Sequence, residues 1–257
     1  MKKAKKILCY LLCAGAAAAV IVFTAAFLIS YDETTNVFVA GNVKIVLSEY
    51  KYPGNDSPTV KDLIPYQTIE KNPVVTNTGT SDAYIFLRLT VPAAQVTELD
   101  EYGRKLTADP VLQELFYLKS AGDGAGDLAH HFGSGWVEIR SLASGGYYDA
   151  LNQWTFTEGA GSRTYVFAYQ PAGGDPFLRA GESTVPLFET VQYKNLKEQP
   201  GRSDPVKVIG VEAFAVQAEY LSAKEEEIAA MMEEENVPLE QRAERRLAEI
   251  FAMAADS

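Results

Sequence analysis

Two adjacent histidines, His130 and His131, are the side chains of this chain best suited to metal or acid–base chemistry. Zinc hydrolases usually hold their metal with three protein ligands, often two histidines spaced on one helix face. Neighbouring side chains instead point to opposite faces of a strand or diverge around a helix, so adjacent histidines chelate poorly. We therefore expect an exposed loop pair. The alternative is a loop that bends both histidines together, with Glu138 or Asp127 completing a metal site.

Other patterns typical of catalytic or binding sites are incomplete. The run Gly133-Ser134-Gly135-Trp136 is not a Gly-x-Ser-x-Gly nucleophile elbow. Gly122 to Gly126 lacks the Lys-Ser/Thr pair of a phosphate-binding loop. Asp123, Asp127 and Asp149 could offer oxygens to Ca²⁺, but without EF-hand spacing. We assign no catalytic residue, no cofactor and no metal ligand from the sequence, so the residues favour a protein that is not an enzyme and leave a metalloendopeptidase as the alternative.

The elements around these residues are predicted to be mainly β-strands. Between residues 83 and 91, Ile85, Leu87 and Leu89 alternate with residues that face the other side. Glycine- and proline-rich turn clusters separate the predicted strands. Many short strands of this kind predict an antiparallel, jelly-roll-like β-sandwich over residues 27–222. Further strands are expected at Trp136–Ile139, Tyr147–Phe156, Thr164–Tyr169, Ser183–Tyr193 and Val206–Ala218.

Two segments depart from the β pattern. Asp109-Pro110 resembles an N-cap followed by a first-turn proline, and the apolar spacing beyond it predicts a short inserted helix over Pro110–Lys119. Residues 223–257 predict an acidic, amphipathic helical tail, interrupted at Pro238. We expect this tail to pack on the sandwich; the alternative is a helix that binds a partner.

The first residues have the layout of a secretory signal. Four lysines precede an uncharged run from Ile7 to Tyr31, which contains the small residues Thr24-Ala25-Ala26. We predict a signal peptide over residues 1–26, cut by a signal peptidase between Ala26 and Phe27. A retained membrane anchor is the alternative, since roughly 20 apolar residues span a bilayer. In that case the protein would contact the membrane only through its uncleaved signal segment.

Removal of this leader changes the composition of the protein. It takes away four lysines, no acid and both cysteines (Cys9 and Cys13), so the net charge moves from −11 to −15. A chain this acidic is a poor nucleic-acid binder, because phosphate neutralisation by Lys and Arg supplies most of that affinity. Without cysteines, the fold must hold without disulfides.

Several segments in the same order resemble the TasA/camelysin family of exported Gram-positive proteins. One begins at Ile64-Pro65-Tyr66-Gln67 and continues through Asn72-Pro73-Val74-Val75-Thr76-Asn77-Thr78-Gly79-Thr80-Ser81-Asp82-Ala83-Tyr84-Ile85. The others are Thr35 to Val43, Ala180 to Phe188 and Val211 to Glu219. The tail after residue 219 is outside the resemblance.

The resemblance implies a secreted protein of the cell surface or extracellular matrix with a jelly-roll domain. In fibre-forming relatives the mature N-terminal segment adds as a strand to the next subunit. Here that donor would be Phe27, Leu28, Ile29, Ser30 and Tyr31. We therefore expect a biofilm-type fibre subunit. The alternatives are a secreted metalloendopeptidase, which the name camelysin implies, and a surface adhesin.

Overall fold

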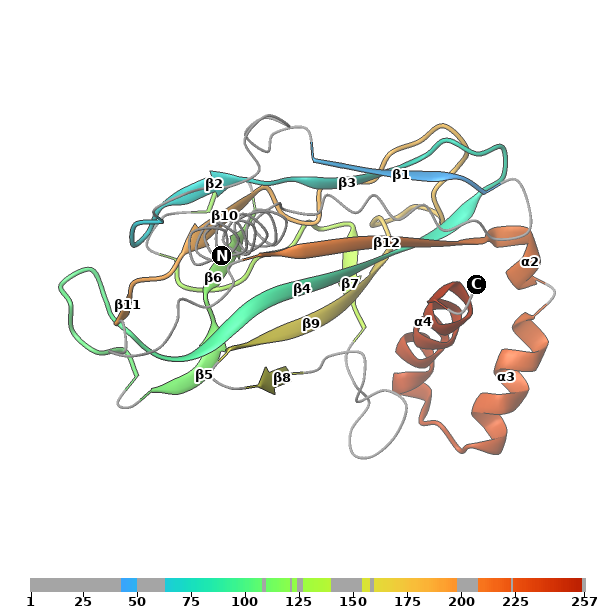
Figure 1. Ribbon diagram of the computed structural model, residues 1–257. Helices are drawn as coiled ribbons and strands as arrows, with labels where there is room; N and C mark the ends of the chain where they lie inside the picture. Colours follow the sequence, from blue (N-terminus) through green and yellow to red (C-terminus); the bar gives the residue numbers. More distant parts are fainter. Residues whose placement is uncertain are drawn as a thin grey trace, which may run out of the picture. The chain divides into compact units, whose positions relative to one another are not determined.

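One long strand, β4 (Ala83–Glu98, 16 residues), organises the main sheet in the computed structural model of the protein (Figure 1). It pairs with β12 (Gly210–Gln217) and then β5 (Val111–Glu114) along one edge. Its other edge pairs with β9 (Ala160–Tyr169). The same residues of β4 pair both with β9 and with β12 or β5, so β9 must lie on the opposite edge. The short strand β11 (Leu196–Lys197) joins its end, and β7 (Trp136–Glu138) and β8 (Trp154–Thr157) pair with β9.

A second layer of short strands lies over this sheet (Figure 1). In it, β1 (Ile45–Glu49) pairs with β3 (Pro73–Asn77). Beside them, β10 (Thr190–Tyr193) lies between β2 (Thr68–Glu70) and β6 (Phe116–Lys119). Every one of these pairs is antiparallel, so the expectation of a mainly β, antiparallel protein is confirmed.

The structure describes residues 43–49, 63–107, 110–120, 122–123, 127–139, 154–157, 160–197, 208–222 and 224–255. The predicted signal peptide 1–26, the cleavage site between Ala26 and Phe27, and the donor segment Phe27–Tyr31 lie outside these ranges. Within them, no helix is long and apolar enough to cross a membrane.

Both faces of β4 are buried, which the alternating pattern alone does not predict. Leu87 and Leu89 are fully buried on one face, as expected. On the other face, Phe86 is also fully buried because helices cover it. These helices are α2 (Ala218–Ser222), α3 (Glu225–Glu234) and α4 (Leu239–Ala255).

Aromatic packing fixes α4 to the sheet. The Phe251 ring lies 5.7 Å from that of Phe86 and 5.4 Å from that of Phe214 on β12. Arg246 adds a polar tie, because its Nη2 donates to the Tyr84 hydroxyl at 3.1 Å and its Nε pairs with Glu225 at 3.0 Å. The helices therefore form a third layer on the sheet.

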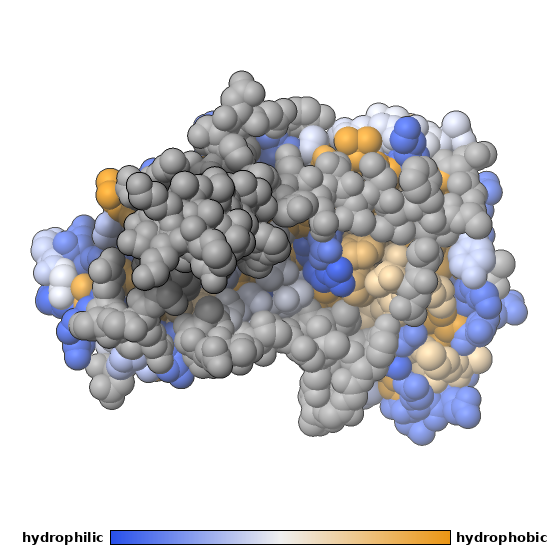
Figure 2. All heavy atoms as spheres, viewed as in Figure 1, coloured by the Kyte–Doolittle hydropathy of each residue, from blue (hydrophilic) through white to orange (hydrophobic). Residues whose placement is uncertain are grey.

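The outward side of α3 is acidic. Glu226, Glu227, Glu233 and Glu234 are exposed on α3, whereas Ile228 and Met232 of the same helix are buried. Figure 2 shows this division, with hydrophilic side chains gathered on the outer surface of the helical region and apolar ones beside the sheet.

The helix predicted over Pro110–Lys119 is wrong: the segment forms two strands. Residues 111–114 pair with β4 as β5, and residues 116–119 pair with β10 as β6. Leu115 between them is fully buried and its N–H bonds to the Pro92 carbonyl. The helical spacing misled because the polar positions of this segment, Glu114 and Tyr117, face a buried polar network instead of solvent. Asp109, the expected N-cap, lies outside the described residues.

The strand predicted over residues 183–193 is shorter than expected. Of residues 183–193 only β10 is a strand; Ser183 forms a single bridge to Thr76, and Pro186 follows it without an N–H to donate. Of residues 147–156, β8 begins at Trp154, and the residues before it lie outside the described ranges.

Candidate functional site

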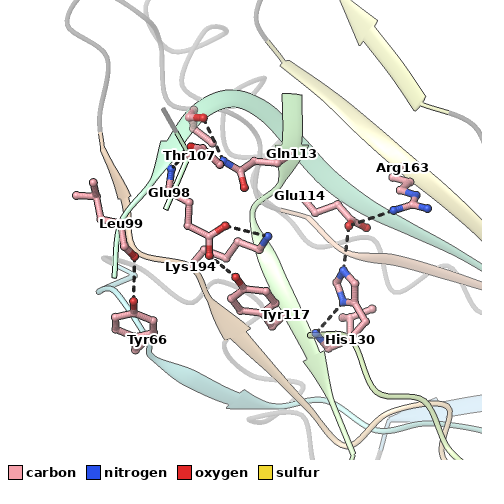
Figure 3. A network of polar contacts seen from close by, with 12 residues as sticks. Tyr66, Glu98, Leu99, Thr107, Gln113, Glu114, Tyr117, His130, Arg163 and Lys194 are labelled. Carbon is pink, nitrogen blue, oxygen red and sulfur yellow. Dashed lines mark hydrogen bonds and ion pairs between the residues drawn. The ribbon is translucent and has the colours of Figure 1, made fainter. Parts of the chain in front are cut away.

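A network of buried charged and polar side chains joins the ends of β4, β5, β6 and β10 (Figure 3). Its two carboxylates, Glu98 and Glu114, are 6% and 5% exposed, and Lys194 is 7% exposed. Charged groups this far from water persist only when they are paired and hydrogen-bonded. A buried network of paired acids and bases is one setting for catalysis, so this network is the first candidate functional site.

The first half of the network is centred on Glu98 at the end of β4. The Tyr117 hydroxyl donates to Glu98 Oε1, and Lys194 Nζ lies 3.5 Å from Glu98 Oε2. The same ammonium lies 4.3 Å from the centre of the Tyr117 ring, a cation–π arrangement. Beside it, Tyr66 donates to the Leu99 carbonyl at 3.0 Å.

Burial shifts the protonation equilibria of this half. Burial, then the adjacent Glu98 carboxylate, raises the pKa of Tyr117, so its phenol stays protonated and donates. Burial lowers the pKa of Lys194, although Glu98 and Glu114 act in the opposite sense. The hydroxyl is thus a fixed donor and not a nucleophile.

The second half is centred on Glu114 at the end of β5. The Tyr165 hydroxyl donates to Oε1 at 2.7 Å, and His130 Nε2 lies 2.9 Å from Oε2. Arg163 Nη1 lies 3.8 Å from Oε2. Burial alone would raise the pKa of Glu114, but the hydrogen bonds from His130 and Tyr165 and the charge of Arg163 outweigh it and lower the pKa below 4.5. Burial and Glu114 together raise the pKa of Tyr165.

Both ring nitrogens of His130 are used within this network. Nδ1 accepts a hydrogen bond from the Leu118 N–H at 3.1 Å, so the neutral ring carries its hydrogen on Nε2 and donates it to Glu114. A metal could bind this ring only by displacing one of these bonds. The placement of His130 is therefore structural.

His131 faces a different group. Its Nε2 lies 2.6 Å from Asp127 Oδ2, and Asp123 is close to both. One ligand atom from each of these three residues lies within 4.8 Å of the others. The two histidines thus do not converge, as the argument that neighbouring side chains chelate poorly predicts. The expectation of an exposed pair is wrong for His130, because its side chain is only 20% exposed and lies in the buried network. Of the further ligands considered, Asp127 lies beside His131, Glu138 lies on β7, and Asp149 lies outside the described residues.

A surface depression of about 730 Å³ lies away from both clusters. Its lining includes Tyr169, Phe177, Arg179 and Glu182 and none of the network residues. Arg179 is held there by Asp175 at 2.8 Å. The depression is open and carries no paired acid and base that would indicate catalysis.

Sequence reasoning did not find the buried network. A signal was present, because Glu114 interrupts the apolar neighbours Leu112, Leu115 and Phe116. An acidic residue inside an apolar run either lies on a solvent-exposed face or forms hydrogen bonds in the interior. Glu114 does the second, with partners on β9 and in the loop before β7. Those contacts depend on strand pairing that residue spacing alone does not predict.

Comparison of the chain with protein-family models, with curated proteins and with solved structures gives no match, so its function must be argued from its own residues.

Proposed function

We propose that the protein is an exported structural protein of the cell surface or extracellular matrix, a jelly-roll subunit that assembles with copies of itself. One observation carries the proposal. Three of the segments that resemble the TasA/camelysin family, residues 72–85, 180–188 and 211–219, fold against one another. The resemblance therefore lies in one connected part of the structure.

Main-chain and side-chain bonds join these segments. The Val75 N–H donates to Thr184 Oγ1 at 3.0 Å, and the hydroxyls of Thr76 and Ser183 lie 2.8 Å apart. On the other side, β12 pairs with β4 from Ala83↔Gln217 onward. Contacts among the three segments that resemble the TasA/camelysin family support the proposal that this chain shares the family's fold.

The turn between β3 and β4 requires asparagine at position 77, because its side-chain amide bonds three backbone groups. Asn77 is fully buried, and its Nδ2 donates to the carbonyls of Ser81 and Leu178, at 2.9 and 3.1 Å. Its Oδ1 accepts from the Gly79 N–H at 3.0 Å. The Asn-Thr-Gly turn thereby closes the β3–β4 connection and ties it to the segment before residue 180.

Assembly by strand addition needs an acceptor edge. In the described part of the chain, β12 pairs with β4 along one edge and with no strand along the other. Its eight residues could receive a donor such as Phe27–Tyr31 through main-chain hydrogen bonds. The placement of His130 between Glu114 and Leu118 removes this histidine from metal binding, so the metalloendopeptidase alternative would have to rely on His131.

N-terminal sequencing and electron microscopy of the secreted protein test this proposal. We expect a mature chain that starts at Phe27 and forms fibres. A variant in which a Gly/Ser stretch of equal length replaces residues 27–31 should fold but stay monomeric. Strictly monomeric behaviour of the correctly processed protein at high concentration would contradict the proposal. Chelator-sensitive casein cleavage, lost in a His130→Ala/His131→Ala double variant, would favour the protease instead.

Disulfide trapping locates the acceptor edge, because the mature chain would contain no cysteine of its own. Cysteines placed at Leu28 and Val211 in one chain should cross-link successive copies if β12 receives the donor strand. A control chain with cysteines at Leu28 and Tyr102, which is 73% exposed in the loop after β4, should stay uncross-linked. Equal cross-linking in both chains would exclude β12 as the specific edge.

A further inference from the structure

The loop between β6 and β7 brings two carboxylates and one imidazole together. Asp123, Asp127 and His131 are all half-buried, and one ligand atom from each lies within 4.8 Å of the others. Ligand atoms about 2 Å from a common metal are separated by roughly 3–4 Å, so a single ion fits here once the 2.6 Å contact between His131 Nε2 and Asp127 Oδ2 widens slightly. We propose that these three residues form a binding site for a divalent transition-metal ion of the zinc class.

The contact between His131 and Asp127 has the separation of an ion pair but lacks hydrogen-bond geometry. Nε2 of His131 lies 2.6 Å from Asp127 Oδ2, yet among the described residues it has no partner with hydrogen-bond geometry, and the atom is shielded from solvent. A buried ring nitrogen normally makes such a bond. A nitrogen that faces carboxylate oxygens without bonding to them has the placement of a metal ligand.

A second orphaned atom lies in the same loop. The Ser120 hydroxyl is buried without a hydrogen-bond partner among the described residues, and the Ser120 N–H donates to Asp123 Oδ2 at 2.7 Å. This backbone bond orients the Asp123 carboxylate, as outer hydrogen bonds do for metal ligands. A water bound to the ion would give the hydroxyl a partner.

The neighbouring strand holds His131 in position. The backbone N–H of His131 donates to the Leu118 carbonyl at 2.8 Å, while the Leu118 N–H donates to the His130 ring. β6 therefore fixes both histidines and turns them toward different partners. His131 is directed to the carboxylates because His130 is held by Glu114.

The charges of the cluster favour a cation. Within the described part of the chain, neither Asp123 nor Asp127 has an ion pair with a lysine or arginine. A cation held between Asp123 and Asp127 would interact favourably with both carboxylates. The nitrogen donor selects zinc or a similar ion over Ca²⁺ and Mg²⁺, which prefer oxygen ligands, and three protein ligands leave a position for water.

Calorimetric titration of the purified protein with ZnCl₂ in excess MgCl₂ tests the site. We expect one Zn²⁺ per chain. Single variants Asp123→Asn, Asp127→Asn and His131→Gln should each weaken binding by about 100-fold or more, since loss of even an outer hydrogen-bonding partner costs roughly 10–100-fold. Asp175→Asn, an exposed acid paired with Arg179 outside the cluster, is the matched control and should bind as tightly as the unaltered protein.

Nitrogen-15 spectra of labelled histidine give a second readout that needs no variant. Addition of one equivalent of Zn²⁺ should shift the Nε2 resonance of His131 and leave both resonances of His130 in place. The proposal is overturned if stoichiometric binding is absent in the magnesium background. It is also overturned if folded ligand variants bind like the unaltered protein, if Asp175→Asn loses affinity equally, or if Zn²⁺ leaves the His131 resonance unchanged.

Discussion

Replacement of Glu114 by glutamine should destabilise the protein more than any exposed acid-to-amide change. The side chain keeps its volume but loses its charge and one of its two acceptor oxygens. Tyr165 donates to one oxygen and His130 to the other, so the NH₂ of the new amide must face one of these donors. One hydrogen bond is thereby lost, the other becomes neutral, and Arg163 loses its countercharge.

The magnitude follows from these contacts. A hydrogen bond to a charged group contributes about 1.5–3 kcal/mol, and a buried donor left without an acceptor costs about 1–3 kcal/mol. We expect Glu114→Gln to lower the free energy of unfolding by about 3 kcal/mol. That corresponds to a fall in Tm of roughly 6–12 °C for a domain of this size.

Urea denaturation followed by tryptophan fluorescence measures this change, since Trp136 is buried against Tyr169. Glu101→Gln is the control, because Glu101 is exposed and such changes usually stay within about 0.5 kcal/mol. In a double-mutant cycle, Glu114→Gln and Tyr165→Phe should be non-additive by about 1 kcal/mol. A loss below about 1 kcal/mol for Glu114→Gln, or full additivity, would refute the network as described.

The same residue has a defined pH dependence. The pKa of folded Glu114 lies below its ordinary value of 4.5, so the folded state binds fewer protons at this group than the unfolded state. Its contribution is therefore complete above about pH 5 and is lost as the pH falls through the folded pKa. The stability difference between the unaltered protein and Glu114→Gln should shrink below about pH 4.5, measured by urea denaturation across roughly pH 3–7.

Three further predictions concern other parts of the fold. Lys194→Met should cost about 3 kcal/mol in urea denaturation, because it leaves the buried Glu98 carboxylate without its cation. Phe251→Ala should cost about 3–5 kcal/mol by opening the contact between α4 and the sheet, whereas Leu239→Ala, at a residue 79% exposed, should cost less than about 0.5 kcal/mol. Asn77→Ala should lower the free energy of unfolding by about 2–3 kcal/mol, because two carbonyls and one N–H lose their partner; a change within error would show that water replaces it.

The sequence predicts most reliably the strands whose two faces differ. In β4, residues such as Leu87 and Leu89 alternate with Arg88 and Thr90, and a period of two admits one backbone conformation. The amphipathic pattern of residues 223–257 predicts that a helical tail packs on the sandwich, but it does not predict which face of which strand the tail covers. Phe86 on the second face of β4 is buried by Phe251, which lies 165 residues further along the chain, and no local signal links the two residues.

The segment 110–119 shows the opposite case. Its apolar spacing fits a helix, yet strand pairing with β4 and β10 overrides that preference, since each strand also brings a polar side chain into the buried network. The candidate site was predictable in part. The argument that His130 and His131 cannot converge follows from backbone geometry, but their separate partners, Glu114 and Asp127, depend on tertiary contacts.

The pairing of β4 also sets the order in which the chain can fold. Its partners β5, β9, β11 and β12 are spread along the rest of the β region, and the register Ala83↔Gln217 joins residues 134 positions apart. Contacts this distant close slowly, because the loop entropy is lost before the pairing compensates for it. Until β12 and α4 are in place, β4 presents an uncovered edge and the apolar side chains that α4 later covers. A polypeptide that lacks roughly the last 50 residues is prone to aggregate at that stage. Early docking of β12 and α4 on β4 therefore favours correct folding over aggregation.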